Sequence, residues 1–268
     1  MTGVASDQTA TGIIPTEGTH HSLLLNVLGA TVAQAKSELS DIRVKVNGET
    51  FVEATPTFLF DLQKYYGDCV GAANVACIIP IEWELPHLPS DAERTVYALG
   101  MADVTSYVVE VDCGTLVNVT GIEVFSEVTP IRRRLGQHRR INRFPQNFPT
   151  TGLQEIVTLP KEGNDVGYMA LHIELNTGTI SICTVKVGGL NIVDRVPIAL
   201  NQVLLNKMRR TPQATYEHVD FARSRDLGGF LPMANVQDFR QLITWTVAAP
   251  DNYQIYTERV FGLNIATK

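Results

Sequence analysis

Hydrophobic and polar residues alternate along several segments of the chain, as they do in β-strands with one buried face. Tyr107, Val109 and Val111 point to one side, with Val108, Glu110 and Asp112 on the other. Residues 168–175 alternate in the same way, with Met169, Leu171, Ile173 and Leu175 on one side and Tyr168, Ala170, His172 and Glu174 on the other. Turn signals at residues 176–178 and 250–252 separate such short segments. The pattern predicts an all-β fold of the sandwich or barrel type.

A short sequence repeat occurs once in each half of the chain. Residues 44–56 read VKVNGETFVEATP and residues 185–197 read VKVGGLNIVDRVP, which align without a gap. Asn47-Gly48 in the first copy and Gly188-Gly189 in the second lie between short β-branched segments. Such dipeptides supply the two positive-φ positions of a type I′ turn. Each copy is therefore predicted to be a β-hairpin.

A few short helices are expected between the strands. Pro56 and Pro197 each follow a predicted hairpin, where proline is favoured at the first position of a helix. Residues 30–40 have a helical pattern, and Ser90 with Glu93 forms a capping box before a further helix. Asn235 is expected to cap a corresponding helix in the second half.

The second copy of the repeat begins close to half a chain length after the first, which indicates two similar domains in tandem. Residues 127–150 have the proline-containing, non-periodic pattern of a linker, and the first twenty residues are rich in Thr, Gly and Ala. The predicted organisation is a flexible N-terminal arm (1–20), a first β-domain (21–127), a basic linker (128–150) and a second β-domain (151–268).

Composition places the chain among ordinary globular proteins, with 44% hydrophobic and 19% charged residues. No segment has the ~18–20 consecutive apolar residues that cross a bilayer, and the N-terminal residues lack the pattern of a signal peptide. The four cysteines form no CxxC motif, so we expect reduced, structural thiols: Cys69, Cys77, Cys113 and Cys183. These features predict synthesis in a reducing cytoplasm.

Six arginines are concentrated in residues 131–144 (IRRRLGQHRRINRF) of a chain whose formal net charge is −6. They are Arg132, Arg133, Arg134, Arg139, Arg140 and Arg143. Because the predicted linker contains all six, we take them as the candidate functional residues.

The order of predicted elements resembles that of the double jelly-roll major capsid proteins of tailless, membrane-containing icosahedral viruses, in particular corticovirus-like bacteriophages. The resemblance follows DIRVKVNGETF, RTVYALGMADVTSYVVEVD, the arginine-containing linker, VGYMALHIELNTGT and VQDFRQLITWTV along nearly the whole chain. It implies two tandem eight-stranded jelly rolls with short inserted helices. The helical pattern at residues 30–40 departs from the early strand that the first jelly roll of this family has.

The resemblance also implies a structural role in a virion. Three copies would form a homotrimeric, pseudo-hexagonal capsomer, and capsomers would tile an icosahedral shell over an inner membrane. The implied partners are neighbouring capsomers, vertex (penton) proteins, minor membrane proteins and the membrane surface, without direct contact to nucleic acid. No cofactor is predicted; some relatives bind structural calcium, but the sequence identifies no calcium ligands.

The sequence contains no standard catalytic motif, and no catalytic, cofactor-binding or metal site is predicted. Three other groups were weighed: His20-His21 as metal ligands, His172 with Glu174 as a cupin-like metal pair, and Glu82 with Glu84 as glycosidase carboxylates. Histidines and a carboxylate on exposed or subunit-facing strand surfaces are a simpler explanation for the first two groups. For the third, the simpler explanation is that Trp83 packs in the core between two exposed acids. The Asn118 sequon is expected to be unused. A carbohydrate-active or cupin-like sandwich enzyme remains the alternative, followed by a tandem binding module.

Two roles for the arginines stay open. A jelly roll has an even number of strands, so the linker and both termini are expected at one pole, which in the resembled family is the base that faces the membrane. There the arginines would attract anionic lipid. Alternatively, they would form bidentate ion pairs with a neighbouring subunit.

Overall fold

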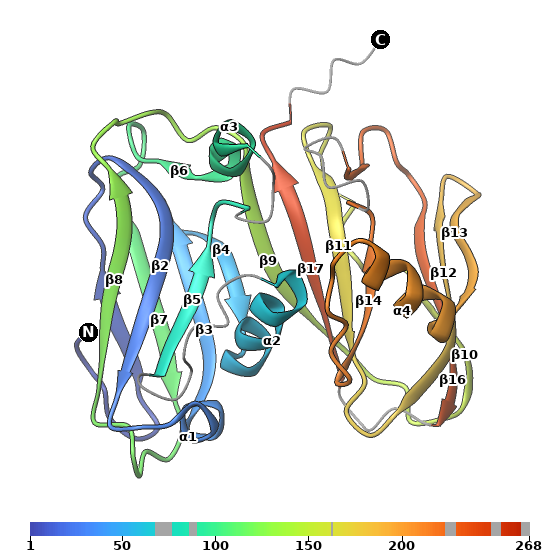
Figure 1. The fold of residues 1–268 in the computed structure, drawn as a ribbon, viewed down its shortest axis with the longest axis horizontal. Coiled ribbons are helices and arrows are strands. Elements are labelled where there is room, and N and C mark those ends of the chain that lie inside the picture. The colour runs from blue at the N-terminus through green and yellow to red at the C-terminus, as the bar shows by residue number, and fades with distance from the viewer. Residues whose placement is uncertain (68–76, 86–89, 162, 223–228, 248–252, 264–268) are drawn as a thin grey trace. The chain divides into compact units, whose positions relative to one another are not determined.

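A computed structural model describes the chain in six stretches: residues 1–67, 77–85, 90–161, 163–222, 229–247 and 253–263. The chain divides into two compact units, Met1–Asn142 and Arg143–Lys268. Each unit is a sandwich of two mainly antiparallel sheets (Figure 1).

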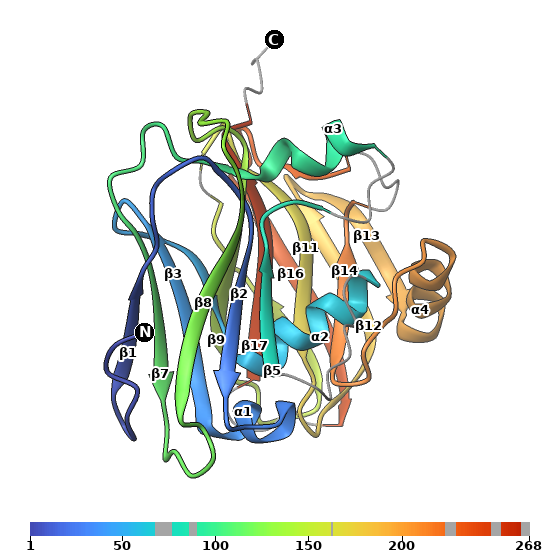
Figure 2. The same cartoon turned by 60° about the vertical axis from the view of Figure 1, so that its left-hand side comes forward.

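Among the described residues of the first unit, three α-helices and one 3₁₀ turn lie between the strands. The strands are β1 (Thr9–Ile13), β2 (Thr19–Leu28), β3 (Leu39–Val46), β4 (Glu49–Ala54), β5 (Cys77–Glu82), β6 (Leu99–Gly100), β7 (Tyr107–Cys113) and β8 (Gly121–Thr129), with β9 (His138–Gln146) beginning in this unit. One sheet has the order β1-β7-β3-β4, and β9 lies parallel to β4 through Val52 and Ile141. In the other sheet β2 pairs with β5, β6 and β8. Figure 2 shows β8, β2 and β5 side by side.

The second unit repeats this arrangement. Its strands are β10 (Gly152–Ile156), β11 (Gly167–Glu174), β12 (Thr179–Val187), β13 (Leu190–Pro197), β14 (Tyr216–Asp220), β15 (Leu231–Pro232), β16 (Phe239–Val247) and β17 (Tyr253–Phe261). One sheet has the order β10-β16-β12-β13, and in the other β11 pairs with β14, β15 and β17. Over the described residues, β1–β8 therefore correspond one by one to β10–β17.

The two predicted hairpins are confirmed as β3–β4 and β12–β13. Asn47 and Gly48 have φ values of 51° and 82°, and Gly188 and Gly189 have values of 56° and 82°. Two consecutive positive φ angles in a two-residue loop define the type I′ turn, whose twist matches that of the strands. The repeat in the sequence thus marks equivalent places in the two units.

A helix follows each hairpin: α2 (Pro56–Tyr66) in the first unit and α4 (Ile198–Lys207) in the second. The Thr55 hydroxyl accepts the Phe58 N–H and so caps α2, and Pro56 is its first residue, as predicted. Pro197 lies one position earlier than predicted, at the N-cap of α4.

The other helix predictions have mixed outcomes. Residues 32–38 form α1 (Val32–Glu38), where Thr31 and Gln34 make a capping box, and strands β2 and β3 are both retained around it. Ser90 and Glu93 cap the short α3 (Asp91–Arg94), which the 3₁₀ turn η1 (Thr95–Tyr97) continues. The helix expected after Asn235 is wrong, because β16 begins at Phe239 and pairs with β12.

Each unit has its own apolar core between its two sheets. In the first, Val44, Val109 and Val111 face Leu23 and Leu25 from the opposite sheet, and all are buried. The core of the second is formed by Leu171, Ile173, Val185, Ile243 and Trp245 with their neighbours. The alternation predicted for β7 is confirmed, whereas β11 is buried on both faces.

Two expected boundaries are corrected. The predicted flexible arm contains β1, which pairs with β7 from Thr9↔Asp112 to Ile13↔Val108, and Thr2 bridges to Thr11. The predicted basic linker contains β9, so residues 138–146 are part of a strand. The first segment is rich in Thr and Gly and the second contains arginines and a proline, so neither has a clear strand pattern. Their pairing partners lie about a hundred residues away in the sequence. The turn expected at residues 250–252 and Cys69 lie outside the described residues.

Candidate functional site

The six candidate arginines separate into two groups by local structure. Arg132, Arg133 and Arg134 lie in the irregular segment between β8 and β9 and are exposed. Arg139, Arg140 and Arg143 lie on β9 and are partly or fully buried. The arginines therefore do not form one uniform basic surface.

In the exposed group, two guanidinium groups bind main-chain carbonyls of the first unit. Arg132 donates to the Met101 carbonyl from Nε at 3.2 Å and from Nη2 at 3.0 Å. Arg133 donates to the carbonyls of Thr95 and Ala98, the latter at 2.9 Å. The chain passes so close to Gly100 that a Cβ there would overlap the carbonyls of residues 133 and 134. These contacts fix the path of residues 131–134 on the first unit.

The first two arginines of β9 contact aromatic rings. The Arg140 guanidinium lies 4.3 Å from the centroid of the Phe51 ring and donates to Glu49 at 2.7 Å, and the ring of His138 stacks on Phe51 at 4.6 Å. Arg139 is buried, with its guanidinium 5.4 Å from the Tyr66 ring. Such cation–π contacts stabilise by about 0.5–2 kcal/mol each. Arg139 and Arg140 thus help to cover β4 and α2.

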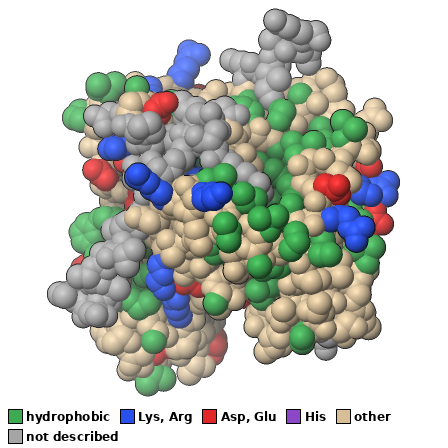
Figure 3. Space-filling view, turned by 45° about the vertical axis from the view of Figure 1, so that its right-hand side comes forward, with side chains coloured by type: hydrophobic (Ala, Val, Ile, Leu, Met, Phe, Trp, Pro, Cys, Tyr) green, Lys and Arg blue, Asp and Glu red, His purple; other side chains and the backbone are tan. Residues whose placement is uncertain are grey.

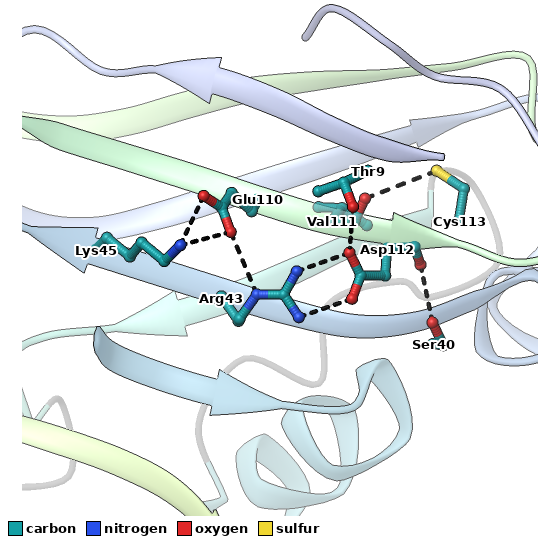
Figure 4. Close-up of polar contacts among 8 residues, drawn as sticks. All are labelled: Thr9, Ser40, Arg43, Lys45, Glu110, Val111, Asp112 and Cys113. Atoms are coloured by element: carbon teal, nitrogen blue, oxygen red, sulfur yellow. Dashed lines mark hydrogen bonds and ion pairs between the residues drawn. The ribbon is translucent and has the colours of Figure 1, made fainter. Parts of the chain in front are cut away.

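The outer face of the β1-β7-β3-β4 sheet carries a ladder of charged side chains (Figure 4). Arg43 on β3 binds both oxygens of Asp112 at 2.7 Å and donates from Nε to Glu110 at 3.2 Å. Lys45 binds Glu110 at 2.8 and 2.9 Å, and Thr9 donates to Asp112 at 2.7 Å. The pKa of Glu110 is lowered, by Lys45 and then by Arg43. The ladder thus covers this face of the sheet with side chains whose charges are paired.

The corresponding face of the second unit lacks this ladder and is hollow. By strand register, Thr184 replaces Arg43 and Leu242 replaces Glu110, because Thr184 pairs with Leu242 as Arg43 pairs with Glu110. Leu153 and Ile182 similarly replace Thr9 and Asp41. A groove of about 340 Å³ opens there, lined by Leu153, Ile182, Thr184, Lys186, Asn191, Asp194, Arg195, Leu242 and Thr244.

The histidine and carboxylate candidates for enzyme chemistry have structural partners. His172 is fully buried, with Nδ1 2.6 Å from Nδ1 of His218 and Nε2 2.6 Å from Glu258. Both ring nitrogens are thus in use, which leaves no lone pair for a metal shared with Glu174. Burial, and then His172, lower the pKa of His218 well below its usual range. Among the described residues, no group of three or more His, Cys, Asp or Glu side chains is arranged to hold a metal ion.

The remaining candidates also lie in packed positions. His20 contacts the Ser126 hydroxyl at 2.6 Å, whereas His21 contacts Glu84 at 3.1 Å, so these adjacent rings do not converge. Trp83 is buried and donates to the Tyr107 hydroxyl at 2.9 Å, which makes it the anchor expected between Glu82 and Glu84. Cys77, Cys113 and Cys183 are buried free thiols, and burial raises the pKa of Cys183 to about 12.

The Asn118 side chain belongs to a tight carboxylate site. Its amide donates to Glu38 at 2.6 Å, and Glu38 also accepts the backbone N–H groups of residues 117–119 at 2.9–3.1 Å. The N–H of Val119, followed by the Asn118 amide, lowers the pKa of Glu38 to about 2. The sequon asparagine therefore anchors the loop before β8 to the end of α1.

The sequence did not identify the outer sheet faces as sites. The aligned hairpin sequences did carry a signal, namely charged residues at equivalent positions. Lys45 aligns with Lys186, and Glu53 aligns with Asp194. The equivalent residues of β7 and β16 could be identified only from the register in which these strands pair with β3 and β12. No described helix is long and apolar enough to cross a membrane.

Two family models and several solved structures are similar to the chain. The model of the viral coat protein P2 N-terminal domain matches residues 1–129, and that of the C-terminal domain matches residues 138–263. A search of curated proteins finds no match.

The similar structures are of capsid proteins. The major capsid protein P2 from Bacteriophage PM2 has a TM-score of 0.85 and 17% identity, covering 97% of this chain and 94% of that one. The STIV MCP, from Sulfolobus Turreted Icosahedral Virus, has a TM-score of 0.68 and 10% identity, covering 99% and 96%. The PBCV-1 virus capsid model has a TM-score of 0.59 and 10% identity, covering 97% and 92%. At these identities the likeness establishes the shared fold.

Proposed function

The chain belongs to the viral coat protein P2 family, and from this premise we propose that it is the major capsid protein of a bacteriophage-like virion, assembled as a homotrimer. The double jelly-roll fold predicted from the sequence is confirmed, and the place of a coat protein is the virion capsid. The observation that carries the proposal is that the two domain models of one coat protein match in order, one in each unit.

The internal repeat supports the proposed trimer. Two sandwiches with the same strand order in one chain provide six similar sandwiches in three copies, the number needed for a capsomer with hexagonal outline. Such capsomers would tile an icosahedral shell and meet penton proteins at its vertices. In this role the protein needs no catalytic chemistry.

We propose that only the exposed part of the basic segment contacts a membrane. Arg139, Arg140 and Arg143 are strand residues, whereas Arg132, Arg133 and Arg134 are exposed. We assign contact with an inner membrane, and with minor membrane proteins, to the exposed group. Each arginine close to an anionic bilayer contributes about 1 kcal/mol, so three copies in one capsomer would act together.

The trimer is tested by mass photometry and sedimentation of the purified protein. We expect a species three times the 29.5 kDa mass of the chain, with a hexagonal outline in electron micrographs. A species that stays monomeric from nanomolar to ~50 µM concentration would contradict the proposal, since an obligate interface of ~2,000 Å² or more persists over that range.

The membrane contact is tested separately with liposomes. We expect wild-type trimers to bind anionic vesicles more than neutral ones, with binding that decreases between ~50 and ~300 mM salt as the Debye length shortens. Arg132→Ser/Arg133→Ser/Arg134→Ser should remove the preference without changing the mass of the trimer. Equal binding of wild type and triple variant would refute the membrane role and leave the capsid role in place.

A further inference from the structure

The edge formed by β13 and α4 in the second unit is exposed at positions that are buried in the first unit. Ile192 is 47% exposed, whereas its counterpart Phe51 is 1% exposed. Two positions of α4 show the same difference from α2, when the helices are aligned with the 141-residue offset of the hairpins. Leu200 and Val203 are 50% and 51% exposed, and their counterparts Leu59 and Leu62 are 1% and 2% exposed.

Part of the cover on the first unit comes from β9. Ile141 pairs with Val52 on β4, and the His138 ring and the Arg140 guanidinium lie against Phe51. No described residue of the second unit pairs with the free side of β13 in this way. A strand edge and helix with this many apolar side chains need a cover in a soluble, stable assembly. Figure 3 shows hydrophobic side chains spread over the face that carries α4 and β13.

This surface has a basic rim. Residues 186–209 contain four cations, Lys186, Arg195, Lys207 and Arg209, and one acid, Asp194, which accepts a hydrogen bond from Asn191 at 2.9 Å. We call β13, α4 and these cations the β13–α4 surface. In a chain with a net charge of −6, such a local excess of positive charge favours an acidic partner.

A matching acidic surface lies on the first unit, on the outer side of β5, β2 and β8. Phe125 is 54% exposed and Ile78 is 40% exposed there. Glu123 and Glu127 flank Phe125 on the same side of β8, and their hydrogen-bond partners, Asn26 and Ser22, are neutral. Residues 115–129 contain no Lys or Arg. We call this outer side the β8 face.

The β8 face also has a buried counterpart in the other unit. The corresponding side of β14, β11 and β17 carries His172, His218 and Glu258, which are exposed by 2% or less. Each unit thus leaves open one surface whose counterpart is buried. One open surface is apolar with a basic rim, and the other is apolar with acidic residues.

We propose that the β13–α4 surface of one copy binds the β8 face of a second copy of this chain. This inference rests on the proposed function and specifies its subunit contact. Because the two surfaces differ, the contact is head-to-tail, and a head-to-tail contact that closes makes a ring, here of the three copies proposed above. Glu123 and Glu127 would then face cations such as Lys207 and Arg209 across an apolar centre formed by Phe125, Leu200 and Val203.

Charge reversal tests the pairing of the surfaces. We expect Lys207→Glu/Arg209→Glu and Glu123→Lys/Glu127→Lys each to weaken the trimer about 100-fold or more, since like charges then meet at the contact. The chain that carries all four substitutions should recover the trimer, because the charges are exchanged and complementary again. The control Lys161→Glu reverses one charge on neither surface and should leave the trimer unchanged. Circular dichroism and thermal melting confirm that each variant is folded.

Each result supports or overturns the inference. Trimers that persist in both reversed variants would overturn it while leaving the proposed function intact. Monomeric reversed variants without recovery in the fourfold variant would show that these surfaces do not contact each other. A wild-type protein that is monomeric throughout would overturn the proposed function together with the inference. Recovery of the trimer only in the fourfold variant would establish the head-to-tail contact.

Discussion

The guanidinium of Arg43 binds the carboxylate of Asp112 through two hydrogen bonds of 2.7 Å, one from each terminal nitrogen. This bidentate pair joins β3 to β7 on a partly exposed face. Arg43→Met is expected to lower the free energy of unfolding by about 1–2 kcal/mol, measured by urea denaturation. Arg43→Lys keeps the charge but loses the fork geometry, so about half of that loss should remain. An unchanged stability of Arg43→Met would show that the ladder is only a solvated charge pattern.

Glu38 predicts how acid affects the first unit. Its pKa is held at about 2 by hydrogen bonds to the ionised carboxylate, below the usual value of 4.5. Because the folded state favours the charged form, this contribution is present above pH 4.5 and is lost as the pH falls towards 2. Glu38→Gln should therefore lower the melting temperature at pH 7 and have a smaller effect near pH 2.5. An equal loss at both pH values would contradict the assignment.

Glu217 predicts the opposite dependence in the second unit. Burial raises its pKa to about 7, opposed by the hydrogen bond from Asn201 at 2.6 Å. As the pH rises, Glu217 loses its proton in the unfolded chain before it does so in the folded protein. Its contribution to the free energy of unfolding is therefore fully present below pH 4.5 and decreases as the pH rises to about 7. Glu217→Gln retains an oxygen that accepts the Asn201 bond and should stabilise the protein by roughly 2 kcal/mol at pH 8, with little effect at pH 4. Thermal melts at the two pH values measure this difference.

Arg140 and Arg134 should differ although both belong to the same basic segment. Arg140→Ser removes the contact with Phe51 and the bond to Glu49, with an expected loss of about 1–2 kcal/mol in the free energy of unfolding. Arg134 is exposed, and Arg134→Ser should change stability by less than ~0.5 kcal/mol. Equal effects of the two substitutions would mean that Arg140 on β9 does not contact Phe51 and Glu49 on β4.

The two hairpin turns predict a cost that depends only on backbone conformation. A Cβ at Gly48 or Gly189 would meet no atom within 4 Å, yet both residues have a φ of 82°. Gly48→Ala and Gly189→Ala should each destabilise the protein by about 1 kcal/mol. Gly136 is equally open but has no positive φ, so Gly136→Ala is the matched control and should be neutral or slightly stabilising.

The sequence predicted the features that depend on local residue patterns. The hairpins were identified because Asn-Gly and Gly-Gly between β-branched residues have few other uses, and α2 because Pro56 follows a predicted hairpin. The fold class followed from this repeat and from the resemblance. The signals for each hairpin and the helix after it are contained within about fifteen residues.

The features that were missed depend on distant pairing. The strand at residues 9–13 contains Thr and Gly and is formed by its register with Val108–Asp112. Arg139 and Arg140 lie on β9, where Ile141 pairs with Val52, and nothing in residues 131–144 indicates this pairing. The helix expected after Asn235 was wrong because VQDFRQLI fits either period over so short a segment. The candidate arginines were therefore recognised as unusual, but their division into exposed and strand residues was not.

The pairing of Ile141 with Val52 also determines where the protein can be cut into independently folding fragments. A first-unit fragment that ended at residue 129, where the similarity to the N-terminal domain model ends, would lack the strand that covers β4 and would expose Val52 and Phe51 at a bare sheet edge. A fragment that ended at Asn142 would keep the first five residues of that strand, His138–Asn142, including Ile141. The thirteen residues between these endpoints should accordingly decide whether the isolated unit is recovered as a monodisperse protein or as aggregate.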